Sequence, residues 1–219
     1  MPVAVTIDQV LQLAPRCGEP YRDAFLRGQT VLNHYAISAT PLRVAHFIAQ
    51  VLHESGDLTR QFENLRYSPE RLRLVWPQRF LPLGPLDPAD FAYNAEKLAN
   101  DVYGGRMGNT LPGDGYLYRG RGLLQLTGKD SYERATTFLK LGAPDAPDLA
   151  ANPDVVVAAP WCLQVACALW SARGCNGAAD RDDVGEVTWL INGGEIGLAE
   201  RRALTDKTRA VWRPAFTLR

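Results

Sequence analysis

The sequence lacks a net charge, since its 24 basic residues balance its 24 acidic ones among 219 residues. Nucleic-acid-binding proteins usually carry a basic excess, so the balance argues against a nucleic-acid partner. Long apolar runs are missing too. The longest, at 155–168, contains Pro160 and Gln164 and is shorter than the roughly 20 apolar residues that span a bilayer.

The N-terminus lacks the basic segment and the apolar segment of a secretion signal. We therefore expect no stable membrane anchor and a protein that stays in the cytoplasm of the cell that makes it. A substrate beyond the membrane would then require a separate means of release.

Cysteine and histidine are scarce, with four and three residues respectively. The cysteines, at positions 17, 162, 167 and 175, have no metal-binding spacing, and we expect reduced, mostly buried thiols. The alternative is a disulfide bond between Cys167 and Cys175. His53-Glu54 begins like the zinc-protease motif HExxH, but Asp57 replaces its second histidine, so we expect no metal and no cofactor.

Most of the local patterns in the sequence indicate helices. Thr40-Pro41 is a typical helix start, apolar residues follow at helical spacing up to Leu52, and Gly56 can end the helix. The same start signal recurs at residues 68–69, 87–88 and 152–153. Residues 160–172 are apolar nearly all round and predict a buried helix, whereas 197–212 predict an arginine-rich surface helix.

Strand signal is scarce. The best candidate is Gly115–Thr127, where apolar residues alternate around glycines after a turn-forming Gly113-Asp114-Gly115. We expect a mainly α fold with a small β-hairpin or three-stranded sheet. Residues 1–219 would form a single domain, in which a small helical lobe at about 64–106 flanks a cleft.

Glu54 is the first candidate catalytic residue, because it ends the apolar helix and faces a loop. A negative charge at a helix C-terminus is unfavourable, which suggests a role other than stability. Hydrolysis of a glycosidic bond needs a carboxylic acid that holds its proton, as apolar surroundings help it do, and a second carboxylate. Asp57, Glu63, Glu70 and Glu133 are the candidates for the second, and position alone favours Glu63 only slightly over Asp57.

The stretch from Gly120 to Thr127 has the polar groups that a sugar site needs. Its glycines allow the backbone to approach a ligand closely. Gln125 and Thr127 are two residues apart, so on a strand both would point the same way and could hold an acetamido group or a water.

Several long motifs resemble glycoside hydrolase family 19, which includes chitinases and phage endolysins. The similarity runs from about Val31 to Leu204 in the right order. It is carried by the HFIAQVLHESG run that contains Glu54, by ENLRYS from Glu63, and by VYGGRMGN, GDG, YRGRG, QLTG and INGG with Glu200-Arg201 further along. The ENLRYS and YGGRMGN runs are similar to the endolysin branch.

The resemblance implies a lysozyme-like fold and an inverting reaction. By it, Glu54 matches the general acid, Glu63 the second catalytic glutamate, and Thr127 a residue that holds the nucleophilic water. Gln125 and Asn192 match positions that contact sugar. Arg201 matches an arginine in the ion network around the acid, with Glu195 as its expected other partner. The chain departs from the family pattern at Asp57, where glycine is common, at Ser131, where a sugar-binding asparagine is expected, and at Glu200, where aspartate is common.

The resemblance also implies a substrate with N-acetylated amino sugars joined by β-1,4 bonds. We expect an endolysin that cleaves peptidoglycan glycan strands, with no separate cell-wall-binding domain. It would be a monomer held in the host cytoplasm until a holin or equivalent pore releases it to act in the periplasm. Alternatives are a chitinase, a lytic transglycosylase and a non-catalytic glycan-binding module.

Overall fold

The computed structural model describes residues 1–213. Its helices are α1 (Ile7–Leu13), α2 (Glu19–Leu26), α3 (Gln29–His34), η1 (Ile37–Ala39), α4 (Pro41–Ser55), α5 (Pro69–Val75), η2 (Pro88–Asp90), α6 (Ala95–Tyr103), α7 (Asp114–Leu117), α8 (Lys129–Gly142), η3 (Pro153–Val157), α9 (Trp161–Ala172), α10 (Cys175–Asp180), α11 (Val184–Asn192) and α12 (Leu198–Val211). The prediction of a mainly α fold is confirmed.

Helix α4 has the ends that local chemistry predicts. The Thr40 hydroxyl accepts a hydrogen bond from the Arg43 backbone N–H, and Pro41 occupies the first turn. Gly56 ends the helix in the left-handed conformation, with a φ of 55°. Since Glu54 precedes the last helical residue, these two ends place it at the mouth of the following loop.

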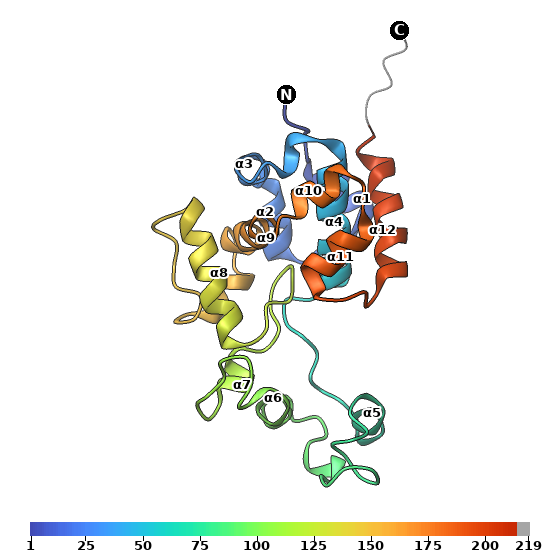
Figure 1. Cartoon of the computed structure of the whole chain (residues 1–219), viewed down its shortest axis with the longest axis vertical. Coiled ribbons are helices and arrows are strands. Elements are labelled where there is room, and N and C mark those ends of the chain that lie inside the picture. The colour runs from blue at the N-terminus through green and yellow to red at the C-terminus, as the bar shows by residue number, and fades with distance from the viewer. Residues whose placement is uncertain (214–219) are drawn as a thin grey trace.

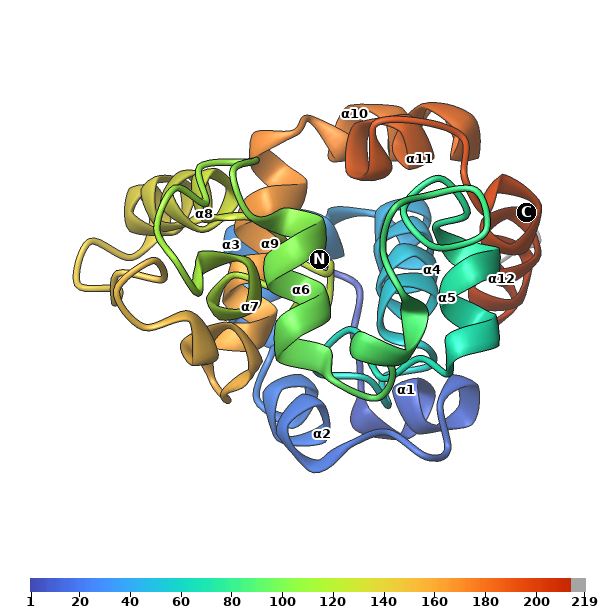
Figure 2. The same cartoon turned by 90° about the horizontal axis from the view of Figure 1, so that it is seen from below.

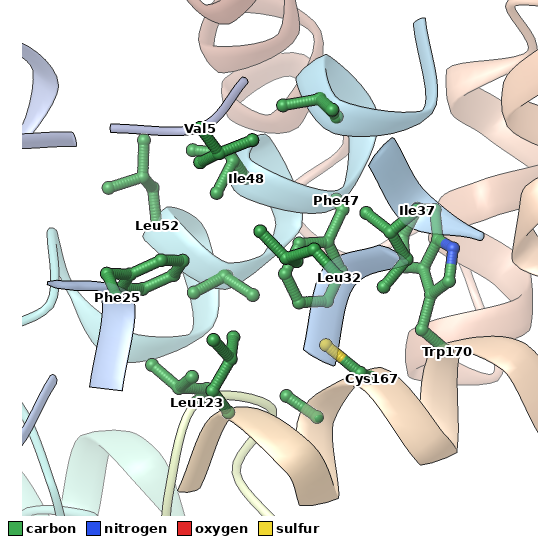
Figure 3. Close-up of a cluster of buried hydrophobic side chains, with 14 of the residues drawn as sticks. Val5, Phe25, Leu32, Ile37, Phe47, Ile48, Leu52, Leu123, Cys167 and Trp170 are labelled. Carbon is green, nitrogen blue, oxygen red and sulfur yellow. The ribbon is translucent and has the colours of Figure 1, made fainter. Parts of the chain in front are cut away.

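The largest core cluster surrounds α4 and α9. Phe47, Ile48 and Leu52 of α4 pack with Trp170 of α9 and with side chains from the N-terminal segment, as Figure 3 shows. Phe47 meets Trp170 edge to face, with ring centroids 5.4 Å apart. Helix α9 is buried on nearly all sides, as its sequence predicts. Helix α12 covers the other side of α4 (Figure 1).

Two smaller clusters extend this body. One joins α8 to α9. The other is a separate apolar cluster built between Leu65 and Val102, which includes Leu72 of α5, Phe80 and Leu98 of α6. Helices α5, α6 and α7 lie below the body in Figure 1 and face the viewer in Figure 2. Residues that follow Glu63 thus pack mainly among themselves before the chain returns to the body.

The β-hairpin expected over Gly115–Thr127 is not found. Helix α7 takes up the start of that segment, and among residues 1–213 the structure has only isolated bridges. Arg121 pairs with Leu126 and also with Phe62. Gly122 and Gln125 have positive φ values of 76° and 46°, so the chain turns back at once instead of extending. A compact loop therefore replaces the sheet.

The cysteines are free thiols, and Cys162, Cys167 and Cys175 are buried, whereas Cys17 is half-buried. Burial raises the pKa of Cys162 and of Cys175 to about 12, as suits inert core residues. Within the described part of the chain, no helix combines the length and apolarity needed to cross a bilayer.

Candidate active site

Glu54 is held by an ion pair with a residue 147 positions later. The Arg201 Nη2 of α12 donates to Glu54 Oε1 at 2.5 Å. The Arg201 side chain is 2% exposed and that of Glu54 is 15% exposed, so the pair lies at the edge of the buried region. The apolar surroundings expected for Glu54 are therefore only partly realised, because a guanidinium occupies one side of its carboxylate.

Arg201 in turn is fixed from two further directions. Its Nη1 donates to Gln50 Oε1, one helical turn before Glu54, and its Nε donates to the Ile196 carbonyl at 3.3 Å. The other partner expected from the family resemblance, Glu195, is exposed and is not paired with Arg201. The neutral side-chain amide of Gln50 binds Arg201 instead.

Glu63 lies in the loop after α4, and two donors converge on its carboxylate. The Tyr103 hydroxyl donates to Oε2 at 2.7 Å, and the Gly120 backbone N–H donates to Oε1 at 2.5 Å. The Glu63 backbone N–H also donates to the Gly120 carbonyl at 3.0 Å. This pairing ties the loop after α4 to the glycine-rich segment, and it leaves the carboxylate half-buried.

Gly120 is the point where three site residues meet. A Cβ atom added there would lie 3.2 Å from each of three atoms, namely Gln125 Oε1, Thr127 Oγ1 and Glu63 Cβ. Only a residue without a side chain fits this spacing without displacing a neighbour. The fold therefore brings Glu63 together with Gln125 and Thr127, which belong to a separate motif of the sequence.

Glu54 and Glu63 line the same hollow, whose volume is about 310 Å³. Its walls are polar throughout and consist of His53, Glu54, Arg60, Glu63, Asn64, Tyr67 and Gln125. A wall of this kind suits a ligand rich in hydroxyl and amide groups.

Other predicted residues lie apart from that wall. Asn192 is the exposed last residue of α11 and is not among the lining residues. The rival carboxylates Asp57, Glu70 and Glu133 are exposed and do not line the hollow. Asp57 has a φ of 55°, a conformation that favours glycine.

His53 lines the hollow beside Glu54. Burial lowers the pKa of His53, and the positive charge of Arg201 lowers it further, against the opposing charge of Glu54. The imidazole is therefore neutral at neutral pH, and it can either donate or accept a hydrogen bond at the site.

A larger hollow, of about 550 Å³, lies beside α12 and also contains carboxylates. Those carboxylates have structural partners: Asp182 pairs with His46 and Arg209, Asp206 pairs with Arg209, and Asp183 caps α11. We therefore assign the candidate site to the Glu54 hollow. No group of residues in 1–213 has the composition of a metal site.

Sequence reasoning missed Gln50 and Tyr103 as partners of the two glutamates. Gln50 had a detectable signal, since it precedes Glu54 by four residues and therefore shares its helix face. Tyr103 had none beyond its place in the VYGGRMGN motif, because it meets Glu63 across a separation of 40 residues.

No family model matches the chain. A "glycosyl hydrolase family 19 domain-containing protein" of Haemophilus influenzae is 40% identical over 164 residues, which cover 73% of this chain and 75% of that protein.

Solved structures give the same fold. Chitinase C from Streptomyces griseus HUT6037 matches with a TM-score of 0.58 and 18% identity over 95% of this chain and 76% of its own. A bacterial family 19 chitinase matches with a TM-score of 0.57 and 20% identity over 95% of each chain.

Proposed function

Because the chain belongs to glycoside hydrolase family 19, we propose that it is an endolysin that cleaves the β-1,4 bonds of peptidoglycan. Glu54 is the general acid and Glu63 the general base of an inverting reaction. The observation that carries this proposal is that both carboxylates line one polar hollow, each held by its own donors.

The proposed reaction uses each group once. Glu54 gives its proton to the bridging oxygen as the bond from that oxygen to the anomeric carbon breaks. A water attacks the carbon from the opposite face, and Glu63 takes the proton that the water loses. Exchange with solvent then returns the proton to Glu54. An inverting enzyme needs roughly 6.5–9.5 Å between the two carboxyl groups to leave room for that water.

Three further residues have supporting roles in this proposal. Thr127 holds the water, because its hydroxyl lies beside the Gly120 backbone that also binds Glu63. Gln125, on the wall of the hollow, contacts the sugar. Asn192 contacts a more distant sugar of the glycan strand. No metal or cofactor takes part.

Arg60 supports peptidoglycan as the substrate. This exposed arginine lines the hollow and has no carboxylate partner among residues 1–213. Peptidoglycan carries peptides with free carboxylates on alternate sugars, whereas chitin is uncharged. An unpaired guanidinium beside the reacting bond would attract the charged polymer and would add nothing for the neutral one.

Chitin is the second candidate substrate, because the structural neighbours named above are chitinases. Digestion of Gram-negative sacculi and colloidal chitin side by side separates the two. We expect wild type to clear sacculi and to release no chitin oligomers, and we expect Glu54→Gln and Glu63→Gln to be inactive. Soluble chitin oligomers with intact sacculi would make the protein a chitinase.

The products distinguish the remaining alternatives. Mass spectrometry of digested sacculi should show ordinary reducing ends. Anhydro-muramyl ends would indicate a lytic transglycosylase, and binding to sacculi without any product would indicate a glycan-binding module. Full activity of Glu63→Gln would remove Glu63 from the mechanism.

The biological setting is part of the same proposal. The protein would act as a monomer on peptidoglycan strands in the periplasm, after a holin or equivalent pore releases it from the host cytoplasm. Expression of the protein with and without a holin tests this step. Only the culture that also expresses the holin should lose turbidity.

A further inference from the structure

We propose that Gln50 is a positioning residue whose neutral amide holds Arg201 in place without competing for its charge. The positive charge of Arg201 is then available to Glu54 alone. This inference rests on the proposed role of Glu54, and it concerns a residue that does not touch the hollow.

The contacts around Arg201 define the role of Gln50. Gln50 and Glu54 lie one turn apart on the face of α4 that packs against α12. Arg201 uses a different nitrogen for each partner: Nη1 for Gln50, Nη2 for Glu54 and Nε for the Ile196 carbonyl. A planar guanidinium held at all three nitrogens has little freedom to turn, so Glu54 meets a fixed donor.

Burial makes the choice of an amide informative. Gln50 is 0% exposed, and its Nε2 has no hydrogen-bond partner in the described part of the chain. An unpaired buried donor is costly, so stability alone would favour another residue at this position. Glutamate would have the same size, would accept the same hydrogen bond, and would leave no donor unpaired. That glutamine stands there instead points to a requirement for zero charge.

The charge count around Glu54 gives the reason. The charged or titratable groups that face this region are His53 on α4, Glu200 and Arg201 on α12, Arg60 and Glu63 in the loops, and Arg173 at the end of α9. Within residues 1–213, Arg201 is the one side chain that pairs with the Glu54 carboxylate. A carboxylate at position 50 would share that arginine and place a second negative charge one turn from Glu54. A nearby like charge favours the protonated form of an acid.

Two substitutions separate position from charge. Gln50→Met keeps the length of the side chain and removes the acceptor. We expect kcat to fall about tenfold or more while KM stays within about twofold, because Gln50 does not contact substrate. Gln50→Glu keeps the acceptor and adds a charge. We expect it to shift the alkaline limb of the kcat–pH profile upward by about half a unit or more.

Gln164→Glu is the matched control. It makes the same chemical change on α9, at a different hollow beside His34 and Tyr35. We expect its kcat–pH profile to equal that of wild type. Circular dichroism and thermal unfolding establish that each variant is folded, and if Gln50→Met fails to fold, the isosteric Gln50→Glu decides alone.

A wild-type pH profile for Gln50→Glu, or a wild-type kcat for folded Gln50→Met, would overturn the inference. All assays use whichever polymer the wild type cleaves, so the choice between peptidoglycan and chitin does not enter. If Glu54→Gln were active, the proposed function would fail instead, and that result would be visible separately.

Discussion

Gly120→Ala tests the arrangement of the site without removing any functional group. The added Cβ would lie 3.2 Å from Gln125 Oε1, Thr127 Oγ1 and Glu63 Cβ. Ordinary van der Waals contacts of this kind begin near 3.4 Å, so each neighbour must retreat by a few tenths of an ångström. The backbone at Gly120 does not have a positive φ, and alanine can adopt it.

The expected effect on activity follows from how sensitive catalysis is to position. A misplacement of about 1 Å can cost about a hundredfold in rate. A shift of a few tenths of an ångström at three groups should therefore lower kcat/KM roughly tenfold, which corresponds to about 1.4 kcal/mol in the barrier. Stability should change little. Alanine restricts the unfolded chain by about 0.4–1 kcal/mol, which offsets part of the strain.

The assay compares kcat/KM and the free energy of unfolding for wild type, Gly120→Ala and a control, Gly177→Ala. Gly177 is exposed on α10, and an added Cβ would meet only the Arg181 side chain, at 3.7 Å. The control should keep full activity. If Gly120→Ala also kept wild-type kcat/KM, Glu63, Gln125 and Thr127 would not act together in catalysis. The catalytic groups would then lie away from Gly120.

Three further predictions address the substrate, the general base and pH. Arg60→Gln should raise KM severalfold on intact sacculi and leave it unchanged on glycan stripped of peptides, because only the peptides supply carboxylates; equal effects on both would refute a charge-reading role. Tyr103→Phe removes one of the two donors to Glu63 and should lower kcat about tenfold or more, since hydrogen bonds to charged groups contribute about 1.5–3 kcal/mol; single-turnover rates would show it. Burial lowers the pKa of His46, so the unfolded chain binds more protons below pH 6.5 and stability falls as pH drops through that window. Urea unfolding from pH 7 to pH 5 should show a shallower loss for His46→Gln than for wild type or for the exposed control His34→Gln, and identical slopes would contradict this account.

Local sequence signals predicted the structure correctly where it depends on residues that are neighbours along the chain. Thr40-Pro41 and Gly56 set the ends of α4, because capping and the left-handed φ are properties of a few consecutive residues. The same is true of the all-round apolar pattern of α9. Those ends put Glu54 at a loop, which is why it could be proposed as a catalytic acid before any coordinates.

The expected hairpin failed for the opposite reason. Alternating apolar residues between Gly115 and Thr127 fit a strand, but Gly122 and Gln125 turn the chain back. Arg121 forms isolated bridges with Leu126 and with Phe62 instead of a continuous ladder. Contacts with a distant segment decided the conformation, and such contacts leave no trace in local periodicity.

By itself, then, the sequence determined the ends of α4, the buried character of α9 and which acid stands at the end of α4, because helix ends and faces follow from nearby residues. Only the tertiary structure decided what surrounds that acid. Arg201 meets Glu54 from 147 positions away, and Tyr103 meets Glu63 from 40. Partners so far apart along the chain are selected by the packing of α12 against α4 and by the return of the loops, which depend on the fold as a whole.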